Sequence, residues 1–450
     1  MKTLFGTDGV RGVANEYPMT SEMVVKIGRA VAYFFQKKNT RSKIIVGKDT
    51  RISGDMIEQG LVSGICSMGS DAYLSGILPT PGIAFLTASM GGDAGVVISA
   101  SHNPFYDNGI KIFQKDGFKL SDETETKLER LLLDKHFPIR GQTIHYTGRV
   151  KYIEDVEKRY VDFLLQTLPN DFCIKDMKIV IDCSNGATYR VAPQLFNRLG
   201  ADVESLFVQP DGKNINNGCG SEHTQVLAKK VREKKAEIGL AFDGDGDRMV
   251  AVDELGNLLT GDQILSICSR LMKQKGTLKN NRVVTTVMSN IGLKIVLKDM
   301  GVKHITTQVG DRYVLEKMIS DGAVLGGEDS GHMLFLDHHT TGDGILTALK
   351  LIEAMKKESR PLSVLNRKMN LFPQSLLNVS VKRKPDIQKV PEISDAIKSV
   401  ETSLGREGRV LVRYSGTQPL CRIMVEGPTI ETTRNYCKMI ADTVQRELGK

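Results

Sequence analysis

The stretch GVVISASHNPFYDNGIKIF, residues 95–113, holds the pattern that decides the fold. Its first four residues are small or β-branched and predict a buried strand. The strand then gives way to hydroxyl, imidazole and amide side chains from Ser99 to Asn103, and Pro104 stops it. An alternating segment that starts at Gly109 predicts a second strand that returns as a hairpin. Because such polar clusters often form plain turns, the rest of the chain must show whether this one has a function.

A strand, a polar turn and a helical pattern follow one another three times along the chain. The strands open the segments KIIVGKDTRISG at 43, KIVIDCSNGAT at 178 and RVVTTVMSNIG at 282. Each helical pattern ends near a glycine that precedes another strand, namely Gly69, Gly200 and Gly301. Strands that alternate with helices in this way form parallel pairs joined by right-handed crossovers. The pattern therefore predicts three similar α/β units.

Each unit then adds one more strand that ends in a polar loop. These strands and loops are AGVVISASHN, AEIGLAFDGDGDR and GAVLGGEDSGH, and a hairpin-like alternation follows each of them. Hairpin partners run antiparallel, so mixed sheets are expected. Ligands of open α/β sheets bind at the carboxyl ends of the strands. We therefore expect the three loops to converge if the units face a common centre.

The C-terminal part of the chain has a different order of elements. SLLNVSVKRK predicts a strand, a helix follows, RVLVRYSGTQPLCRIMVEG predicts two strands, and a helix closes the chain. This order is typical of an α+β domain with an antiparallel sheet. The predicted fold class is therefore α/β, with three similar mixed-sheet α/β/α domains and a C-terminal α+β domain. We place these domains at residues 1–150, 151–255, 256–366 and 367–450.

Composition excludes several classes of function. The 450 residues are too many for one core, and 40% hydrophobic with 25% charged residues is an ordinary globular mixture. The formal charge of +8 is spread out, and basic runs such as KKVREKK at 229–235 are short. Aromatic residues are 6% and Trp is absent, which disfavours nucleic-acid binding. A mild positive field instead favours a small anionic substrate such as a phosphate ester.

The cysteines and the hydropathy of the chain indicate the cellular compartment. Seven scattered cysteines form no CxxC pair, which favours reduced thiols over disulfides or a zinc site. The N-terminus MKTLFGTDGVRG shows no apolar signal region, and no apolar run approaches the ~20 residues of a membrane span. We therefore expect a cytoplasmic protein without a membrane partner.

Three aspartates follow one of the predicted strands in DGDGDR, at Asp243, Asp245 and Asp247. Carboxylates this close raise each other's pKa unless a cation neutralises them. The intervening glycines let the backbone turn the oxygens toward one point, and such oxygens suit Mg²⁺ or Ca²⁺. The spacing also matches an EF-hand loop, but Arg248 stands where that loop needs glycine and the flanks predict strands, so we reject that alternative. An arginine beside metal-binding carboxylates favours phosphoryl-transfer chemistry.

Ser101 follows another of these strands, and we expect it to be exposed close to the predicted metal. A hydroxyl there can carry a phosphoryl group, because the metal and nearby cations neutralise the charge that builds during transfer. Lys111 can reach back as an acid, base or charge partner, or can be an ordinary exposed strand lysine. The chain has no GxSxG elbow, which disfavours a serine hydrolase.

Other polar loops offer further ligands. RYSGTQP, residues 413–419, can cradle a phosphate through a guanidinium, hydroxyls and amides, or can be a simple turn. Glu328 and Ser330 alternate and suit sugar hydroxyls, while His332 is either a proton carrier or a structural histidine. Cations in other polar segments can be anion ligands or members of structural ion pairs: Arg11, Lys48, Arg51 and Arg312.

Four loops of this chain, in this order and spacing, resemble the signature loops of the α-D-phosphohexomutase superfamily. They are ISASHNPFYDNGIKIF, FDGDGDR, GGEDSGH and RYSGTQP, and the resemblance spans essentially the whole chain. It implies a four-domain, heart-shaped enzyme whose cleft is lined by one loop from each domain. Three further segments, LFGTDGVRG, SHNPFYDNGIK and VGDRYVLEKM, are most similar to the bacterial branch that acts on glucosamine phosphates.

The resemblance also implies a role for each candidate site residue. Ser101 would carry the phosphate as phosphoserine and, with Asp243, Asp245 and Asp247, would hold Mg²⁺. The other catalytic residues, which serve the reacting phosphate or shuttle protons, would be Arg11, Lys111 and His332. The substrate would be bound by Arg248, Glu328, Ser330, Arg413, Ser415, Gly416, Thr417 and Arg422.

The implied reaction converts glucosamine 6-phosphate to glucosamine 1-phosphate through glucosamine 1,6-bisphosphate, for amino sugar and cell-wall precursor synthesis. The implied partner is this small phosphosugar; the oligomeric state stays open, with a homodimer as one alternative. Gln418 stands where the family usually has Glu, and Asp329 where similar chains often have Gln or Asn. These departures leave a phosphomannomutase/phosphoglucomutase as an alternative. A non-catalytic phosphosugar sensor is a second alternative, which the intact Ser101 and aspartates disfavour.

Overall fold

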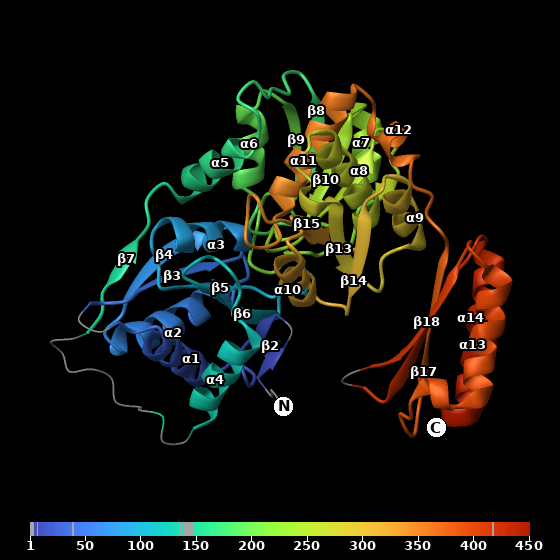
Figure 1. The fold of residues 1–450 in the computed structure, drawn as a ribbon. Helices are drawn as coiled ribbons and strands as arrows, with labels where there is room; N and C mark the ends of the chain where they lie inside the picture. The colour runs from blue at the N-terminus through green and yellow to red at the C-terminus, as the bar shows by residue number, and fades with distance from the viewer. Residues whose placement is uncertain (1–3, 7, 38–39, 135–136, 138–146, 416–417) are drawn as a thin grey trace. The chain divides into compact units, whose positions relative to one another are not determined.

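The computed structural model describes residues 4–6, 8–37, 40–134, 137, 147–415 and 418–450 (Figure 1). The chain forms two compact units, which are described separately. The first unit is Met1–Met288 with Val302–Asn366, and the second is Ser289–Gly301 with Arg367–Lys450. Three sheets belong to the first unit and one to the second. Among the described residues, no helix combines the length and the apolar character needed to span a membrane.

The first sheet has seven strands. In spatial order they are β1 (Phe5–Gly6), β2 (Gly9–Val13), β6 (Asp107–Gln114), β5 (Ala94–Ile98), β3 (Lys43–Lys48), β4 (Asp71–Ile77) and β7 (Val150–Tyr152). β3 pairs in parallel with β4 and β5, while β6 returns antiparallel to β5. The helices of this region are α1 (Ser21–Phe34), α2 (Gly54–Ser67), α3 (Thr80–Ser89) and α4 (Asp122–Leu133). α1 and α2 lie on one face of the sheet and α3 lies on the other (Figure 1).

Apolar strand residues and close helix packing form the core of this region. Ile44, Val46 and Ile98 are fully buried in one apolar cluster together with residues of α1, α2 and α4. The two long helices α1 and α2 touch closely because Gly28 has no side chain; a Cβ there would clash with the carbonyl oxygen of Leu61. This packing fixes β3 and β5, so the loops at their carboxyl ends start from rigid positions.

The second sheet repeats the parallel arrangement. In spatial order its strands are β12 (Leu258–Leu259), β11 (Met249–Asp253), β10 (Ile238–Phe242), β8 (Lys178–Asp182) and β9 (Asp202–Leu206). β8 pairs in parallel with β9 and β10, and β11 returns antiparallel to β10. The helices are α5 (Val156–Gln166), α6 (Val191–Arg198) and α7 (Gln225–Lys234).

The third sheet follows the same plan with four strands. They are β14 (Lys303–Thr307), β13 (Arg282–Thr286), β15 (Leu325–Gly327) and β16 (Met333–Phe335). β13 is parallel to β14 and β15, and β16 is antiparallel to β15. The helices are α8 (Gly261–Gln274), α10 (Asp311–Asp321), α11 (Gly344–Glu358) and α12 (Leu362–Asn366). The predicted parallel pairs and antiparallel returns are therefore confirmed in all three sheets.

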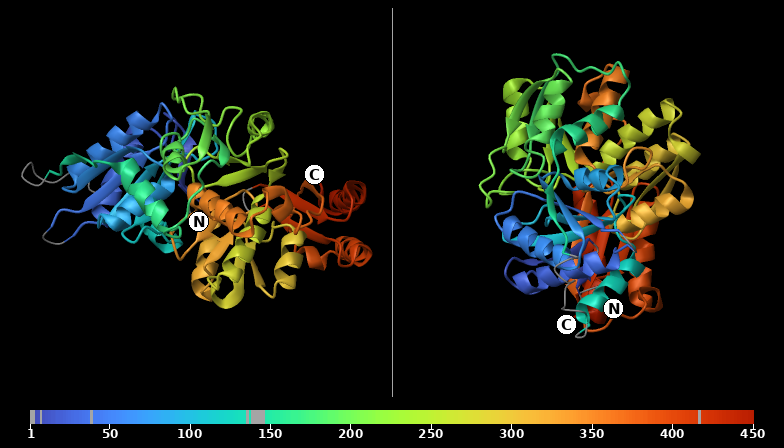
Figure 2. Two further views of the ribbon diagram at one scale, coloured as in Figure 1. Left: turned by 90° about the horizontal axis from the view of Figure 1, so that it is seen from above. Right: turned by 90° about the vertical axis from the view of Figure 1, so that its left-hand side faces the viewer.

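The second unit is built on an antiparallel sheet. Its strands are β17 (Gln374–Ser380), β19 (Leu420–Glu426) and β18 (Arg409–Tyr414), in that spatial order. α13 (Pro391–Leu404) and α14 (Ile430–Leu448) lie together on one face of this sheet (Figure 1 and Figure 2). α9 (Ile291–Asp299) also belongs to this unit, and the backbone N–H of Ile291 donates to Glu426 Oε2 at 3.1 Å. The predicted α/β class with a C-terminal α+β domain is confirmed.

Candidate active site

Ser101 lies in the loop that follows β5, and its side chain points to the acidic loop after β10. Its Oγ donates a hydrogen bond to Asp243 Oδ2 at 2.5 Å, and its backbone N–H donates to Ser99 Oγ at 2.9 Å. The residue is only 1% exposed, so the expectation of an exposed serine is wrong. The physical reason is that the acidic loop packs against Ser101: Gly244 lies against its carbonyl, and Asp243 accepts its hydroxyl.

The acidic loop gathers three buried carboxylates. One ligand oxygen from each of Asp243, Asp245 and Asp247 lies within 4.8 Å of the others. Thr80, at the start of α3, donates its hydroxyl to Asp245 Oδ2 at 2.6 Å, and the Arg248 N–H donates to Asp243 Oδ1 at 3.1 Å. Within the part of the chain that the structure describes, the Oδ1 atoms of Asp245 and Asp247 are buried without a hydrogen-bond partner. Buried carboxylate oxygens left in this state are costly, so they fit a bound dication.

The electrostatics of the triplet agree with that fit. Burial, together with the neighbouring carboxylates of Asp247 and Asp245, raises the pKa of Asp243 well above its usual range. Burial also acts to raise the pKa of Asp247, but the charge of Lys111 and the contact with His332 outweigh it, and the pKa lies well below its usual range. Carboxylate oxygens are the donors that Mg²⁺ and Ca²⁺ prefer. The residues present therefore suit a hard divalent cation.

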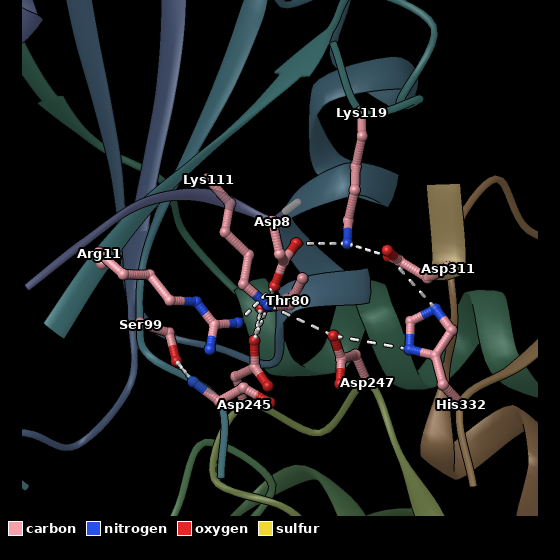
Figure 3. A network of polar contacts seen from close by, with 12 residues as sticks. Asp8, Arg11, Thr80, Ser99, Lys111, Lys119, Asp245, Asp247, Asp311 and His332 are labelled. Carbon is pink, nitrogen blue, oxygen red and sulfur yellow. Dashed lines mark hydrogen bonds and ion pairs between the residues drawn. The ribbon is translucent and has the colours of Figure 1, made fainter. Parts of the chain in front are cut away.

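Lys111, on β6, is the cation that the protein itself places against this triplet. Its Nζ lies 2.7 Å from Asp245 Oδ2, 3.3 Å from Asp247 Oδ2 and 2.9 Å from Asp8 Oδ2 (Figure 3). With 1% exposure it is not a surface strand lysine. Burial acts to lower its pKa, but the three carboxylates outweigh burial and hold the pKa well above its usual value. Lys111 is therefore protonated and is a charge partner of these carboxylates.

His332 lies beside the same triplet, immediately before β16. Its Nδ1 is 3.7 Å from Asp247 Oδ2, and its Nε2 is 3.8 Å from Asp311 Oδ2 (Figure 3). Burial acts to lower its pKa, but the contacts with Asp247 and Asp311 outweigh burial and raise the pKa above the ordinary value. An imidazole between two carboxylates fits both alternatives that the sequence leaves open, a proton carrier and a structural histidine.

Sequence reasoning missed a bridge of charges that links the first and third sheets. Lys119 Nζ lies 2.6 Å from Asp8 Oδ1 and 2.5 Å from Asp311 Oδ2, and all three side chains are largely buried (Figure 3). Asp8 and Asp311 stand in GTDGVRG and VGDRY, segments in which only the arginines were considered. Both aspartates were visible in these motifs, but the motifs lie far apart along the chain, so the sequence did not indicate that Lys119 pairs with both.

The arginines predicted to serve the reacting phosphate border the triplet. Arg11 is 2.6 Å from Asp8 Oδ2, and 30% of its side chain is exposed. Arg248 Nε lies 3.9 Å from Asp247 Oδ1 and is buried without a hydrogen-bond partner among the described residues. Burial acts to lower the pKa of both guanidiniums, and nearby carboxylates outweigh it. Both side chains therefore keep their charge beside the serine loop and the acidic loop.

Other predicted ligands fall into two groups. Glu328 is half-buried and accepts the Gly310 N–H at 3.1 Å, whereas Ser330 is exposed. Three further cations are members of ion pairs: Lys48 with Asp55 and Glu58, Arg51 with Asp49, and Arg312 with Asp122 and Glu125. These pairs support the structural alternative for Lys48 and Arg312; Arg51 also contacts the serine loop, as described below.

The second unit presents a pair of arginines. Arg413 on β18 and Arg422 on β19 stand directly opposite each other. Burial and the charge of Arg422 lower the pKa of Arg413, and Arg422 Nε is buried without a hydrogen-bond partner among the described residues. Ser415 is 4% exposed, and its Oγ accepts the Gln418 N–H at 3.2 Å. Gly416 and Thr417, also predicted as ligands, lie outside the described residues.

Family models match nearly the whole chain. Four models described as phosphoglucomutase/phosphomannomutase cover it: domain I at residues 2–138, domain II at 151–256, domain III at 260–372 and the C-terminal domain at 376–443. Two curated relatives carry the name phosphoglucosamine mutase. That of Syntrophus aciditrophicus is 58% identical and that of Syntrophobacter fumaroxidans 57% identical, each over 100% of both chains.

Solved structures share the fold. A phosphoglucomutase/phosphomannomutase family protein from Burkholderia thailandensis matches with a TM-score of 0.80 at 23% identity, over 100% of both chains. Aspergillus fumigatus N-acetylphosphoglucosamine mutase, solved with GlcNAc-6P and magnesium, matches with a TM-score of 0.69 at 18% identity, over 99% of this chain and 96% of that one.

Proposed function

The chain belongs to the phosphoglucomutase/phosphomannomutase family as an enzyme of the mutase type, and we propose that it interconverts glucosamine 6-phosphate and glucosamine 1-phosphate. The curated phosphoglucosamine mutases named above match it end to end. The observation that carries the proposal is the 2.5 Å contact between Ser101 Oγ and Asp243, inside a buried carboxylate triplet. A phosphate carrier and a dication site adjoin there, as phosphoryl transfer requires.

The proposed carrier of the phosphate is Ser101. In the first half-reaction the C1 hydroxyl oxygen of glucosamine 6-phosphate attacks the phosphoserine phosphorus. The new O–P bond forms as the P–Oγ bond breaks, the hydroxyl proton leaves to a base, and Oγ takes up a proton. The product is glucosamine 1,6-bisphosphate. In the second half-reaction Ser101 Oγ attacks the phosphorus at C6, which releases glucosamine 1-phosphate and restores the phosphoserine.

Phosphorylation of Ser101 creates the need for a cation. The unmodified hydroxyl donates to Asp243, but a phosphate ester on Oγ removes that donor and puts a second anion beside the carboxylate. Like charges in a buried site are strongly unfavourable unless a cation lies between them. We propose that Asp243, Asp245, Asp247 and a phosphoserine oxygen hold Mg²⁺, which would neutralise the charge of the transferring group. The magnesium in the Aspergillus fumigatus relative supports that choice of metal.

The chain's own cations and proton carriers surround the proposed transfer site. Lys111, Arg11 and Arg248 supply fixed positive charge beside the serine loop and the acidic loop. Lys111 is held protonated by three carboxylates and supplies charge, whereas His332 is suited to accept and return the sugar hydroxyl proton. We propose that Glu328 and Ser330 bind sugar hydroxyls.

The phosphate that is not being transferred also needs a partner. We propose that Arg413 and Arg422, with Ser415, Gly416 and Thr417, bind that phosphate, because the two facing guanidiniums are complementary to a dianion. Since the bisphosphate must present each of its phosphates to Ser101 in turn, this site would bind either end of the sugar.

A coupled assay that compares the 6-phosphates of glucosamine, glucose and mannose tests the substrate. We expect the highest kcat/KM with glucosamine 6-phosphate, and formation of glucosamine 1-phosphate. A clear preference for mannose or glucose 6-phosphate would assign the chain to the phosphomannomutase/phosphoglucomutase specificity instead. Absence of turnover with all three sugars, with Ser101 left unphosphorylated by sugar bisphosphates, would identify a phosphosugar-binding protein without catalysis.

A further inference from the structure

The backbone of Ser101 has a left-handed conformation. Its φ is +54°, a region that residues with a side chain seldom adopt. Such a conformation persists only where surrounding contacts hold it. The loop therefore needs specific partners to keep the serine oxygen aimed at the acidic triplet.

Two side chains hold this loop by its carbonyl groups. The Arg51 guanidinium donates through Nη2 to Ser101 O at 3.1 Å and to Asn103 O at 2.6 Å. The Asn216 amide donates through Nδ2 to the same oxygens, at 2.9 Å and 3.0 Å. Both partners of Asn216 are acceptors, so the orientation of its amide is determined. The same two carbonyls are thus clamped by donors from two different regions of the chain.

The two clamping residues have different anchors. Arg51 follows β3 and pairs with Asp49, whose Oδ2 accepts the Ser99 hydroxyl at 2.6 Å; Ser99 in turn accepts the Ser101 N–H. This ring closes within the sheet that carries the serine. Asn216 instead lies between β9 and α7, in the region of the sheet that carries the acidic loop, and its N–H donates to Ser184 O at 2.9 Å.

The acidic loop packs onto the same contact. A Cβ built on Gly244 would lie 2.6 Å from Ser101 O and 2.8 Å from Asn216 Nδ2. Gly244 stands between Asp243 and Asp245, so any side chain at 244 would displace the Asn216–Ser101 contact or the aspartates themselves. The Ser101 carbonyl, the Asn216 amide and the acidic loop therefore pack directly against one another.

We propose that Asn216 is a positioning residue for phosphoryl transfer. It fixes the position of the loop that carries Ser101 relative to the acidic loop, which follows a strand of a different sheet. This inference rests on the proposed function. Arg51 holds the loop to its own sheet, and Asn216 ties it to the sheet that bears the metal ligands. A shift of the phosphate by about 1 Å relative to those ligands is enough to reduce the rate by ~100-fold.

The test replaces Asn216 by glycine and compares it with Asn217→Gly. Asn216 has a φ of +58°, which glycine adopts without strain, so Asn216→Gly removes the donor and little else. Asn217 is an exposed neighbour in the same loop. Asn216→Asp is a second variant of equal shape, in which a carboxylate faces two carbonyl oxygens and repels them.

We expect kcat to fall roughly 10- to 100-fold in Asn216→Gly and at least as far in Asn216→Asp. KM for glucosamine 6-phosphate should stay within about threefold, because the residue acts on the transferred group and not on sugar binding. The rate at which glucosamine 1,6-bisphosphate phosphorylates Ser101, followed by intact-protein mass spectrometry, should fall by the same factor as kcat. Asn217→Gly should match the wild type in all three quantities.

Three results would overturn the inference: kcat of Asn216→Gly within about twofold of Asn217→Gly, a parallel rise in KM that accounts for the loss, or a drop in thermal stability large enough to empty the folded state at the assay temperature. The wild type is assayed first. If glucosamine 1,6-bisphosphate does not phosphorylate its Ser101 and no turnover occurs, the proposed function fails, independently of the variants.

Discussion

The acidic loop of the first unit concentrates negative charge, whereas the arginine pair of the second unit concentrates positive charge. Around Asp243, Asp245 and Asp247 the chain supplies Lys111 as a counter-charge, yet two buried carboxylate oxygens have no hydrogen-bond partner among the described residues. Around Arg413 and Arg422 the described residues supply no carboxylate within ion-pair distance, and the two cations face each other across adjacent strands.

This difference supports the ligand that we propose for each region. Partly neutralised carboxylates with orphaned oxygens are complementary to a small dication, whereas two like-charged guanidiniums in register destabilise a sheet and are complementary to a dianion. Neither arrangement is explained by stability. Each is a cost to the folded chain that a ligand of opposite charge would offset, and both ligands, a metal and a phosphate, belong to the same proposed reaction.

We expect the largest effect from Ser101→Ala, the change at the residue next to the acidic triplet that would carry the phosphate. Without the oxygen that carries the phosphate, turnover should fall by at least about 10³-fold, as for other removed nucleophiles. A coupled assay for glucosamine 1-phosphate measures it, and Ser320→Ala, an exposed serine on α10, is the matched control. Turnover in Ser101→Ala equal to that of Ser320→Ala would show that the phosphoryl group travels by another route.

The next effect concerns the acidic region alone. Asp245→Asn removes one carboxylate of the triplet, and we expect Mg²⁺ affinity to fall by at least about 100-fold. Titration calorimetry with Mg²⁺ measures this directly, and chelation of the wild type should abolish turnover while circular dichroism stays unchanged. The exposed Asp299→Asn is the control. Equal Mg²⁺ affinity in the two variants would remove Asp245 from the metal site.

A smaller effect is expected in the arginine region. Arg422→Met keeps an apolar stem but removes one charge-assisted hydrogen-bond donor, so KM for glucosamine 6-phosphate should rise about 10- to 100-fold. Because the change also relieves repulsion with Arg413, the melting temperature should not fall. Steady-state kinetics and thermal denaturation test both parts against Arg406→Met, an exposed control. A lower melting temperature with unchanged KM would mean that the pair serves stability instead.

The smallest effect concerns a buried carboxylate that belongs neither to the acidic triplet nor to the arginine pair. Burial raises the pKa of Asp343 to about 6, and its side chain accepts from Tyr160 Oη at 2.7 Å and from the Leu346 N–H at 2.9 Å. The unfolded chain ionises near pH 3.8. Between about pH 4 and pH 6 the folded state therefore binds more protons, and this group's contribution to stability falls as pH rises, then stays constant above pH 6.

Asp343→Asn should remove that loss, because an amide keeps the shape and does not ionise: its oxygen can accept the Leu346 N–H, and its NH2 group can donate to Tyr160 Oη in place of the bond that Tyr160 donates to Asp343. The free energy of unfolding of the variant relative to the wild type should rise between pH 4 and pH 6 by up to roughly 3 kcal/mol. Denaturant unfolding at several pH values measures it, with Asp299→Asn as the control. A difference that does not change with pH would contradict this explanation.

Local sequence patterns predicted much of the fold. Alternation and apolar runs mark β5, β10 and β15 and their returning partners, because strand burial leaves a period in the sequence. The acidic triplet was equally visible, since three carboxylates within five consecutive residues must either bind a cation or repel one another.

Contacts between distant segments left no comparable signal. Ser101 packs against Gly244, and the clamp on its carbonyl includes Asn216; both residues lie more than a hundred positions away in the chain. Lys119 was missed for the same reason, because its partners Asp8, between β1 and β2, and Asp311, at the start of α10, lie 111 and 192 positions away in the chain. Ile291 on α9 likewise contacts Glu426 on β19, and no local sequence pattern predicts this contact.

The most direct measurement of the central proposal is a label-transfer experiment on Ser101. The protein is incubated with [³²P]glucosamine 1,6-bisphosphate, freed of sugar, mapped by peptide mass spectrometry, and then mixed with unlabelled glucosamine 6-phosphate. We expect the label on the peptide that contains Ser101 and its transfer within a single turnover to glucosamine 1,6-bisphosphate. Label that resides on another residue, or that stays on Ser101 while the sugar turns over, would contradict the proposal.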